Sequence, residues 1–343
     1  MKRFNKALAL TLVSWGIMAN NASALITIDT VPVDNAGNAN DSTGFGAVGY
    51  NYSIGTYEVT LNQYSAFLNA VGKTDTYGLY NTSMGTDLNV RGISRSGASG
   101  SYTYAVLGSG ARPVTYVSWY DSARFVNWLH NGQPTGAQGA GTTETGAYTL
   151  NGALSGVVTR NANATYSLPS EDEWYKAAYH QPVGQGGDTD NYWLYPTANN
   201  AIPNSRNGNG SDANSANFFR NDGIANGFNG GYAVTDSTTY SASQNYLTDA
   251  GAFSLADGFY GTFDQGGNVW EWNDLVYGSS RGLRGGAWGA YESDMRASYR
   301  LVYAPANEEA FVGFRVAIVP EPSVIGFMAL GMAMLAWKRK RTV

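Results

Sequence analysis

The chain has 343 residues, of which 43% are hydrophobic and 14% are charged, so it is long enough for one large domain or two small ones and apolar enough for a packed core. It contains no cysteine, which excludes a disulfide framework, a thiolate-bound metal and a cysteine nucleophile. Outside residues 1–24 and 319–343, 14 basic side chains stand against 25 acidic ones, and this acidic balance argues against nucleic acid and anionic membrane surfaces as partners.

Residues 1–24 have the three-part pattern of a secretory signal peptide. A basic start is followed by an apolar segment, 7–19, and then by small residues that include Ala22 and Ala24. The pattern predicts export of the protein and cleavage by signal peptidase after Ala24. The alternative interpretation is a folded N-terminal helix.

Residues 25–44 are predicted to form a strand followed by a loop, and three helices are predicted after them, over about 61–71, over about 119–130 and after residue 169. Each helix begins with a capping box, in which a Ser or Thr hydroxyl and a side chain three residues later satisfy backbone N–H groups that lack a partner at a helix start. The boxes are Thr60 with Gln63, Ser118 with Asp121, and Ser170 with Glu173.

The remaining sequence is typical of short strands and long loops. Residues 199–249 are rich in Asn, Gly and Ser, and a structureless segment of that length is unusual inside a compact domain. We therefore expect this segment either to bind something, often a metal, or to be a flexible surface insertion.

The C-terminal segment, 319–343, has a distinctive order of residues. Pro320, Glu321 and Pro322 precede an apolar stretch, 323–337, and four basic residues follow it directly. The stretch is shorter than the ~20 residues of an ordinary transmembrane helix, and the basic residues would stay on the cytoplasmic side. This order resembles the PEP-CTERM sorting signals that exosortases read in Gram-negative bacteria that make exopolysaccharide.

The sorting-signal resemblance implies transient anchoring in the inner membrane through 323–337. It further implies cleavage by exosortase near Pro320, Glu321 and Pro322, and release to the cell surface or extracellular matrix. The alternative interpretation is a permanent short membrane anchor.

Six motifs occur in one order between the two terminal segments. Together they resemble the formylglycine-generating enzyme (sulfatase-modifying factor) family, over about residues 45–318. The resemblance implies a single loop-rich α+β domain with a C-type-lectin-like core and bound calcium. The motifs are Tyr57–Thr60, Arg112–Trp119, Leu168–Trp174, Gly266–Trp272, Arg284–Trp288 and Gly313–Val316.

The active enzymes of this family oxidise a substrate cysteine at a cysteine pair that binds copper(I), a metal favoured by thiolates. Counting from the Arg-Gly-Gly motif, those cysteines would fall at about Ala290 and Met295. Because the chain has no cysteine, copper and formylglycine generation by the family mechanism are excluded. A sister branch holds iron with a histidine cluster, whereas this chain has only His130 and His180, which we interpret as surface residues at helix ends.

The resemblance also implies two calcium sites, because calcium takes carboxylate and carbonyl oxygens. The first would use the carboxylate of Glu271 together with Asn268 and the carbonyls of Gly267 and Val269. The alternative for Glu271 is burial beside an arginine. The second site would use Asn217 and Phe218, with Asp236 or Asp222 as its acid.

Three functions remain open. The first is a catalytically inactive binding or structural module at the cell surface, with exopolysaccharide as the candidate ligand; this function predicts an exposed aromatic cluster. The second is an enzyme with altered, cysteine-independent chemistry, which predicts a cleft with converging titratable groups. The third is a scaffold for another matrix protein, which predicts a large exposed apolar patch.

The candidate pocket residues are Trp288, Glu292, Asp294, Arg296 and Arg300. Five tryptophans are expected to pack in the core: Trp119, Trp174, Trp270, Trp272 and Trp288.

Overall fold

A computed structural model describes residues 25–186, 189–206, 212–221 and 230–319. The predicted signal peptide with Ala22 and Ala24, the motif Pro320-Glu321-Pro322 and the apolar segment 323–337 lie outside these residues. Within the described ranges, no helix is both long enough and apolar enough to cross a membrane.

The N-terminal strands and the last described strand belong to one sheet. Its order is β1-β2-β12-β5, and β12 pairs antiparallel with both β2 and β5. The sheet therefore joins segments from near the start, the middle and the end of the described chain. Its strands are β1 (Thr30–Val33), β2 (Tyr52–Gly55), β5 (Tyr166–Ser167) and β12 (Ala317–Ile318).

A second sheet, of order β10-β9-β8-β11, is built mostly from the C-terminal third of the described chain. Strands β8 and β9 form an antiparallel hairpin, and β11 runs parallel to β8. Two short hairpins, β3–β4 and β6–β7, stand apart from both sheets. The strands are β3 (Ile93–Ser96), β4 (Thr103–Val106), β6 (Phe219–Arg220), β7 (Gly231–Tyr232), β8 (Trp270–Tyr277), β9 (Ser280–Arg284), β10 (Leu301–Tyr303) and β11 (Val312–Gly313).

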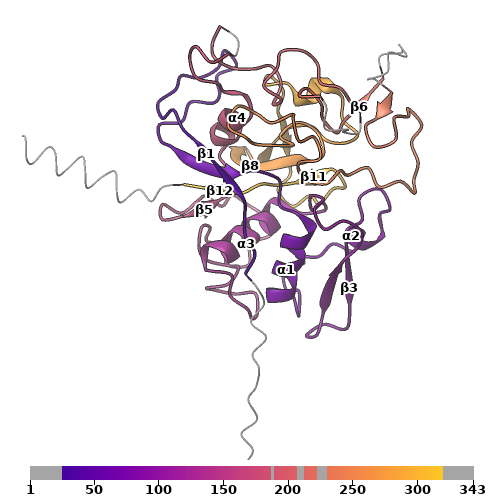
Figure 1. Cartoon of the computed structure of the whole chain (residues 1–343). Coiled ribbons are helices and arrows are strands. Elements are labelled where there is room, and N and C mark those ends of the chain that lie inside the picture. The colour runs from indigo at the N-terminus through magenta and orange to yellow at the C-terminus, as the bar shows by residue number, and fades with distance from the viewer. Residues whose placement is uncertain (1–24, 187–188, 207–211, 222–229, 320–343) are drawn as a thin grey trace, which may run out of the picture.

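All three predicted helices are present, and each begins with its predicted capping box. In Figure 1, α1 and α3 lie below the strands β8, β11 and β12, and α4 lies above them. The elements are α1 (Leu61–Val71), α2 (Ser83–Thr86), α3 (Trp119–His130), α4 (Glu171–Tyr179) and a 3-10 turn, η1 (Glu292–Met295).

The core is rich in aromatic side chains. Phe67 of α1 and Phe125 of α3 pack edge to face, with ring centroids 5.4 Å apart. The expected burial of the tryptophans is confirmed for four of the five, Trp119, Trp174, Trp270 and Trp272. Trp288 differs, because it is only half-buried.

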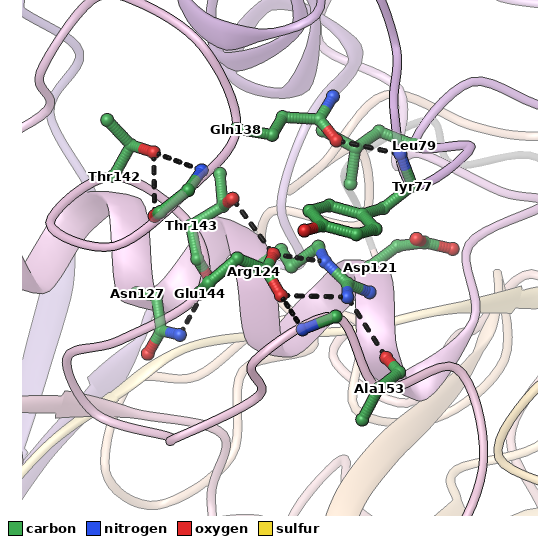
Figure 2. A network of polar contacts seen from close by, with 12 residues as sticks. Tyr77, Leu79, Asp121, Arg124, Asn127, Gln138, Thr142, Thr143, Glu144 and Ala153 are labelled. Carbon is green, nitrogen blue, oxygen red and sulfur yellow. Dashed lines mark hydrogen bonds and ion pairs between the residues drawn. The ribbon is translucent and has the colours of Figure 1, made fainter.

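Buried polar side chains hold the long loops in place. From α3, Arg124 donates two hydrogen bonds to Glu144, at 2.7 and 3.2 Å, and a third to the carbonyl of Ala153 (Figure 2). Asn127, one turn further along α3, donates to the carbonyl of Tyr148 at 2.9 Å. The loop between α3 and β5 is therefore fixed by side chain–backbone bonds instead of by strands, which explains how a domain with short strands stays ordered.

Candidate ligand-binding site

A cavity of about 310 Å³ opens beside the turn that follows β9. The turn is made by Gly285 and Gly286, whose φ angles are +103° and +76°. A Cβ atom on Gly285 would lie 2.7 Å from the carbonyl oxygen of Gln265, so the close approach requires glycine. The turn carries residues 287–290 to the cavity wall. The cavity is lined by Tyr232, Trp270, Ala287, Trp288, Gly289, Ala290 and Phe311.

Aromatic rings stack outward from Trp288 toward solvent. The Trp288 and Tyr246 rings are nearly parallel, with centroids 4.8 Å apart and planes 6° apart. The Tyr240 ring in turn stacks on Tyr246, with centroids 5.8 Å apart, and Tyr240 is 52% exposed. Offset stacking at these separations is favourable, so the rings form a rigid wall.

A second row of rings runs from Tyr232. Its ring lies 6.1 Å from Trp288 and 4.6 Å from Phe219, and Phe219 packs edge to face against Tyr291 at 5.6 Å. Tyr291 is 53% exposed. We define the aromatic cluster as Phe219, Tyr232, Tyr240, Tyr246, Trp288 and Tyr291. Tyr240 and Tyr291 are exposed, Phe219, Tyr232 and Trp288 are half-buried, and Tyr246 is buried, so the exposed aromatic cluster expected of a glycan-binding module is present only in part.

Of the five candidate pocket residues, only Trp288 lines the cavity. Asp294 accepts from the backbone N–H of Tyr291 and caps η1, and burial raises its pKa. Arg296 donates to the Tyr195 hydroxyl at 3.0 Å.

The other two candidates also lie outside the cavity wall. Arg300 donates to Glu171 at 3.1 Å and covers the Phe45 ring, and Glu292 begins η1. Among the described residues, the titratable candidates therefore do not converge on the cavity, as the enzyme alternative expected. The turn after β9 and η1 place their side chains against other neighbours.

The two positions that correspond to the family's cysteines diverge in space. Ala290 lines the cavity, whereas Met295 is fully buried in a separate cluster with Tyr195 and Phe218. The cavity wall at this point offers a methyl group in place of a thiolate.

Glu271 is fully buried and pairs with an arginine. Arg315 donates to both carboxylate oxygens at 2.6 Å, and Trp174 donates its indole N–H to Oε2 at 2.7 Å. Both partners of the ion pair are fully buried. This arrangement is the alternative that the sequence left open, and it leaves one carboxylate lone pair, on Oε1, without a hydrogen bond from these groups.

Two further acids surround this ion pair, and sequence reasoning missed both. Burial raises the pKa of Asp264 to about 6, and Glu271 adds to the effect. Burial, with Asp264 and Glu271 nearby, raises the pKa of Glu58 well above its usual range. Oε2 of Glu58 is buried without a hydrogen-bond partner. Their places in the sequence offered a signal, since Glu58 belongs to the first motif and Asp264 lies three residues before Gly267.

The loop beside Glu271 also supports the aromatic cluster. Asn268 adopts a φ of +59°, and its carbonyl accepts from the backbone N–H of Trp288 at 3.0 Å. Its side-chain oxygen accepts from Asn217 at 3.1 Å, and Asn217 also donates to the carbonyl of Tyr246 at 2.8 Å. Gly267 and Val269 flank Asn268, and Val269 is fully buried.

The residues expected for the second calcium site are dispersed among different neighbours. Asn217 takes part in the contacts just described, and the Phe218 ring packs beside Met295. Asp236 is half exposed and faces Arg206 at 3.6 Å. The other candidate acid, Asp222, lies outside the described residues.

The two histidines differ from the expectation of surface residues. The His180 ring is buried beside Tyr260, whose hydroxyl lies 2.7 Å from Nδ1, and burial together with Lys176 lowers the pKa of His180 to about 4. His130 is half-buried and accepts from the backbone N–H of Thr165. Tertiary packing of the segment around Tyr260 covers the end of α4, which the helix pattern alone did not indicate.

Two small sheets, three capped helices and long ordered loops around an aromatic core define an α+β protein with a C-type-lectin-like fold, and the aromatic cavity is its candidate binding site. The chain belongs to the family described as the sulfatase-modifying factor enzyme 1-like domain, whose profile matches residues 45–319. The family and fold class predicted from the six motifs are therefore confirmed.

Several solved structures are similar to this chain. One is described as the crystal structure of CarF, with 20% identity, a TM-score of 0.48, and coverage of 86% of this chain and 100% of that chain. Variable protein 1 of Treponema denticola has 20% identity, a TM-score of 0.40, and coverage of 85% and 95%. PvdO from Pseudomonas aeruginosa has 17% identity, a TM-score of 0.41, and coverage of 85% and 92%. A comparison with curated proteins finds no match.

Proposed function

We propose that the protein is an exported, catalytically inactive binding module that holds exopolysaccharide in its aromatic cavity. The observation that carries this proposal is the aromatic cluster around Trp288, which combines a wall of stacked rings with exposed tyrosines at its rim. The C–H faces of sugar rings are apolar and stack on aromatic faces, while phenol and indole groups at the edges bond to hydroxyl groups.

The chemistry of the cavity wall supports binding over catalysis. The residues that line it are aromatic, alanine or glycine, and the titratable candidates Glu292 and Asp294 are not among them. A nucleophile or a general acid must lie within hydrogen-bonding reach of the reacting group. The described wall places only tyrosine, of all titratable residue types, beside a ligand, and it offers aromatic surface for binding.

Calcium is the cofactor that we propose beside this site. Glu58, Asp264 and Glu271 are three buried acids near one arginine, and a divalent cation would favour the ionised forms of Glu58 and Asp264, whose pKa values burial raises. The orphaned oxygen of Glu58 also favours a hard cation. Within the described ranges, no three acidic or histidine side chains meet closely enough to hold a metal ion, so most ligands would be backbone carbonyls such as those of Gly267 and Val269.

The proposed location depends on the two terminal segments. Signal peptidase would remove residues 1–24, and exosortase would act near Pro320, Glu321 and Pro322 after transient anchoring in the inner membrane. The mature protein would then lie on the cell surface or in the extracellular matrix, where polysaccharide is available as a ligand.

The test is binding to the host's own exopolysaccharide, measured by affinity electrophoresis. We expect retardation of the native protein and loss of retardation for Trp288→Ala. Trp193→Ala is the matched control, because Trp193 is also a half-buried tryptophan and lies outside the cavity wall. Equal retardation of the native protein and Trp288→Ala would count against the aromatic cavity as the binding site.

A further inference from the structure

The wall of the cavity has no charged side chain among the described residues that line it. Two charged residues close to the cavity or the aromatic cluster in the sequence contact other groups. Arg220, beside Phe219, donates to the carbonyl of Pro203, and Glu309 accepts from the Tyr303 hydroxyl. A ligand in the cavity would therefore meet rings, methyl groups and peptide groups.

An anionic ligand would be disfavoured in this environment for two reasons. Its charge would lose water without gaining a cation, which is costly in free energy. The body of the protein also carries 14 basic against 25 acidic side chains outside the terminal segments, so its field repels a polyanion. An uncharged sugar meets neither penalty.

The rings extend beyond a single sugar position. A row of four rings joins the two exposed tyrosines. The centroids of successive rings are 6.2 Å apart from Tyr240 to Tyr232, 4.6 Å from Tyr232 to Phe219, and 5.6 Å from Phe219 to Tyr291. Tyr232 of this row also lines the cavity beside Trp288. Platforms at both ends of the row suit a ligand that continues past the cavity in both directions.

Tyr232, which lines the cavity, offers a protonated phenol. Burial raises the pKa of Tyr232, and Tyr246, Tyr240 and Tyr291 add to the effect. A neutral phenol both donates and accepts hydrogen bonds, which matches the hydroxyl groups of a sugar.

We infer that the site takes an internal stretch of an uncharged glycan chain, with consecutive sugar units on Tyr240, in the cavity beside Trp288 and on Tyr291. This inference rests on the proposed function and specifies its ligand.

The test uses the full exported protein and affinity electrophoresis in gels that contain neutral polymers (dextran, galactomannan or xylan) or anionic polymers (alginate or polygalacturonate). We expect retardation by at least one neutral polymer and none by the anionic ones. Tyr240→Ala and Tyr291→Ala should each weaken binding to that polymer about two- to tenfold, the contribution of one stacked ring. Neither variant should change binding of the monosaccharide from the same polymer, measured by calorimetry, because one sugar unit fills only the cavity, whose wall includes neither tyrosine. Tyr277→Ala, a 59% exposed tyrosine outside the cluster, is the control.

The outcomes separate the two proposals. Preferential binding to alginate or polygalacturonate would overturn the uncharged ligand and leave the proposed function standing. Equal losses for polymer and monosaccharide would overturn the extended row and also leave that function standing. No retardation by any polymer or by the host exopolysaccharide, for protein whose circular dichroism shows that it is folded, would remove both.

Discussion

Trp288 and Tyr246 stack with their planes only 6° apart, and the backbones of both are held by one buried pair of asparagines. Asn268 accepts from the N–H of Trp288, Asn217 donates to the carbonyl of Tyr246, and the two asparagines bond to each other. The alignment of the cavity wall therefore depends on residues that lie behind it.

Asn217→Ala should misalign the wall without touching a ligand. The substitution leaves the carbonyl of Tyr246 and the side chain of Asn268 short of a donor, which costs about 1–3 kcal/mol. We expect weaker polysaccharide binding and a changed near-ultraviolet circular dichroism spectrum.

Asn127→Ala is the matched control, since Asn127 is also buried and donates to a carbonyl, that of Tyr148. It should destabilise the protein by a similar amount and leave binding unchanged. If Asn127→Ala weakened binding as much as Asn217→Ala, the specific role of the asparagine pair would be refuted.

Arg315→Met should be among the most destabilising single substitutions in this protein. It leaves the buried carboxylate of Glu271 without its cation, next to Glu58 and Asp264, and breaking such a pair costs about 3–5 kcal/mol. The free energy of unfolding from urea titration measures the effect. Arg206→Met breaks the exposed contact with Asp236 instead and should cost about 0–1 kcal/mol. Similar losses for the two variants would show that the buried pair is dispensable.

Calcium should raise the melting temperature, and a chelator should reverse the effect. The pKa of Asp264 is raised to about 6 from 3.8, so the folded state keeps a proton that the unfolded state has released between these values. Without calcium, the contribution of Asp264 to stability is therefore present below pH 4 and is lost as pH rises toward 6. The calcium effect should grow over the same range, because the ion prefers the ionised acid.

Asp264→Asn provides the control for the calcium prediction. The substitution replaces the buried carboxyl group by an amide of similar size that does not titrate. It should therefore remove most of the pH dependence of the calcium effect. Thermal unfolding from pH 4 to pH 7, with calcium and with chelator, measures both. A melting temperature that is insensitive to calcium at pH 7 would exclude the proposed site.

His180 should make the protein sensitive to acid. Burial lowers its pKa to about 4 from 6.5, so the unfolded state binds more protons between these values. Its contribution to stability is complete above pH 6.5 and is lost as pH falls toward 4. His180→Gln should flatten this part of the stability–pH curve, and His130→Gln should leave it in place. An unchanged curve for His180→Gln would argue against a buried, neutral imidazole.

The sequence alone determined the helices and the family. The hydrogen bonds of a capping box such as Ser170 with Glu173 form within four residues, so the start of the helix can be predicted without any distant partner. The order of six motifs predicted the fold, and the absence of cysteine excluded the family's copper chemistry. A capping box depends on neighbouring residues, and the motif order and the composition depend on the sequence alone. None of them depends on the conformation of the loops.

Only the tertiary structure decided which of several similar residues forms the site. Trp288 resembles Trp272 in sequence, but the turn at Gly285 places Trp288 half-buried in the wall of an open cavity, while Trp272 is fully buried in the core. Glu271 meets Arg315 from 44 positions away, and Tyr240 and Tyr291 come to one row from separate loops. Contacts between distant segments depend on how loops close over the core, and neither periodicity nor motif spacing records that closure.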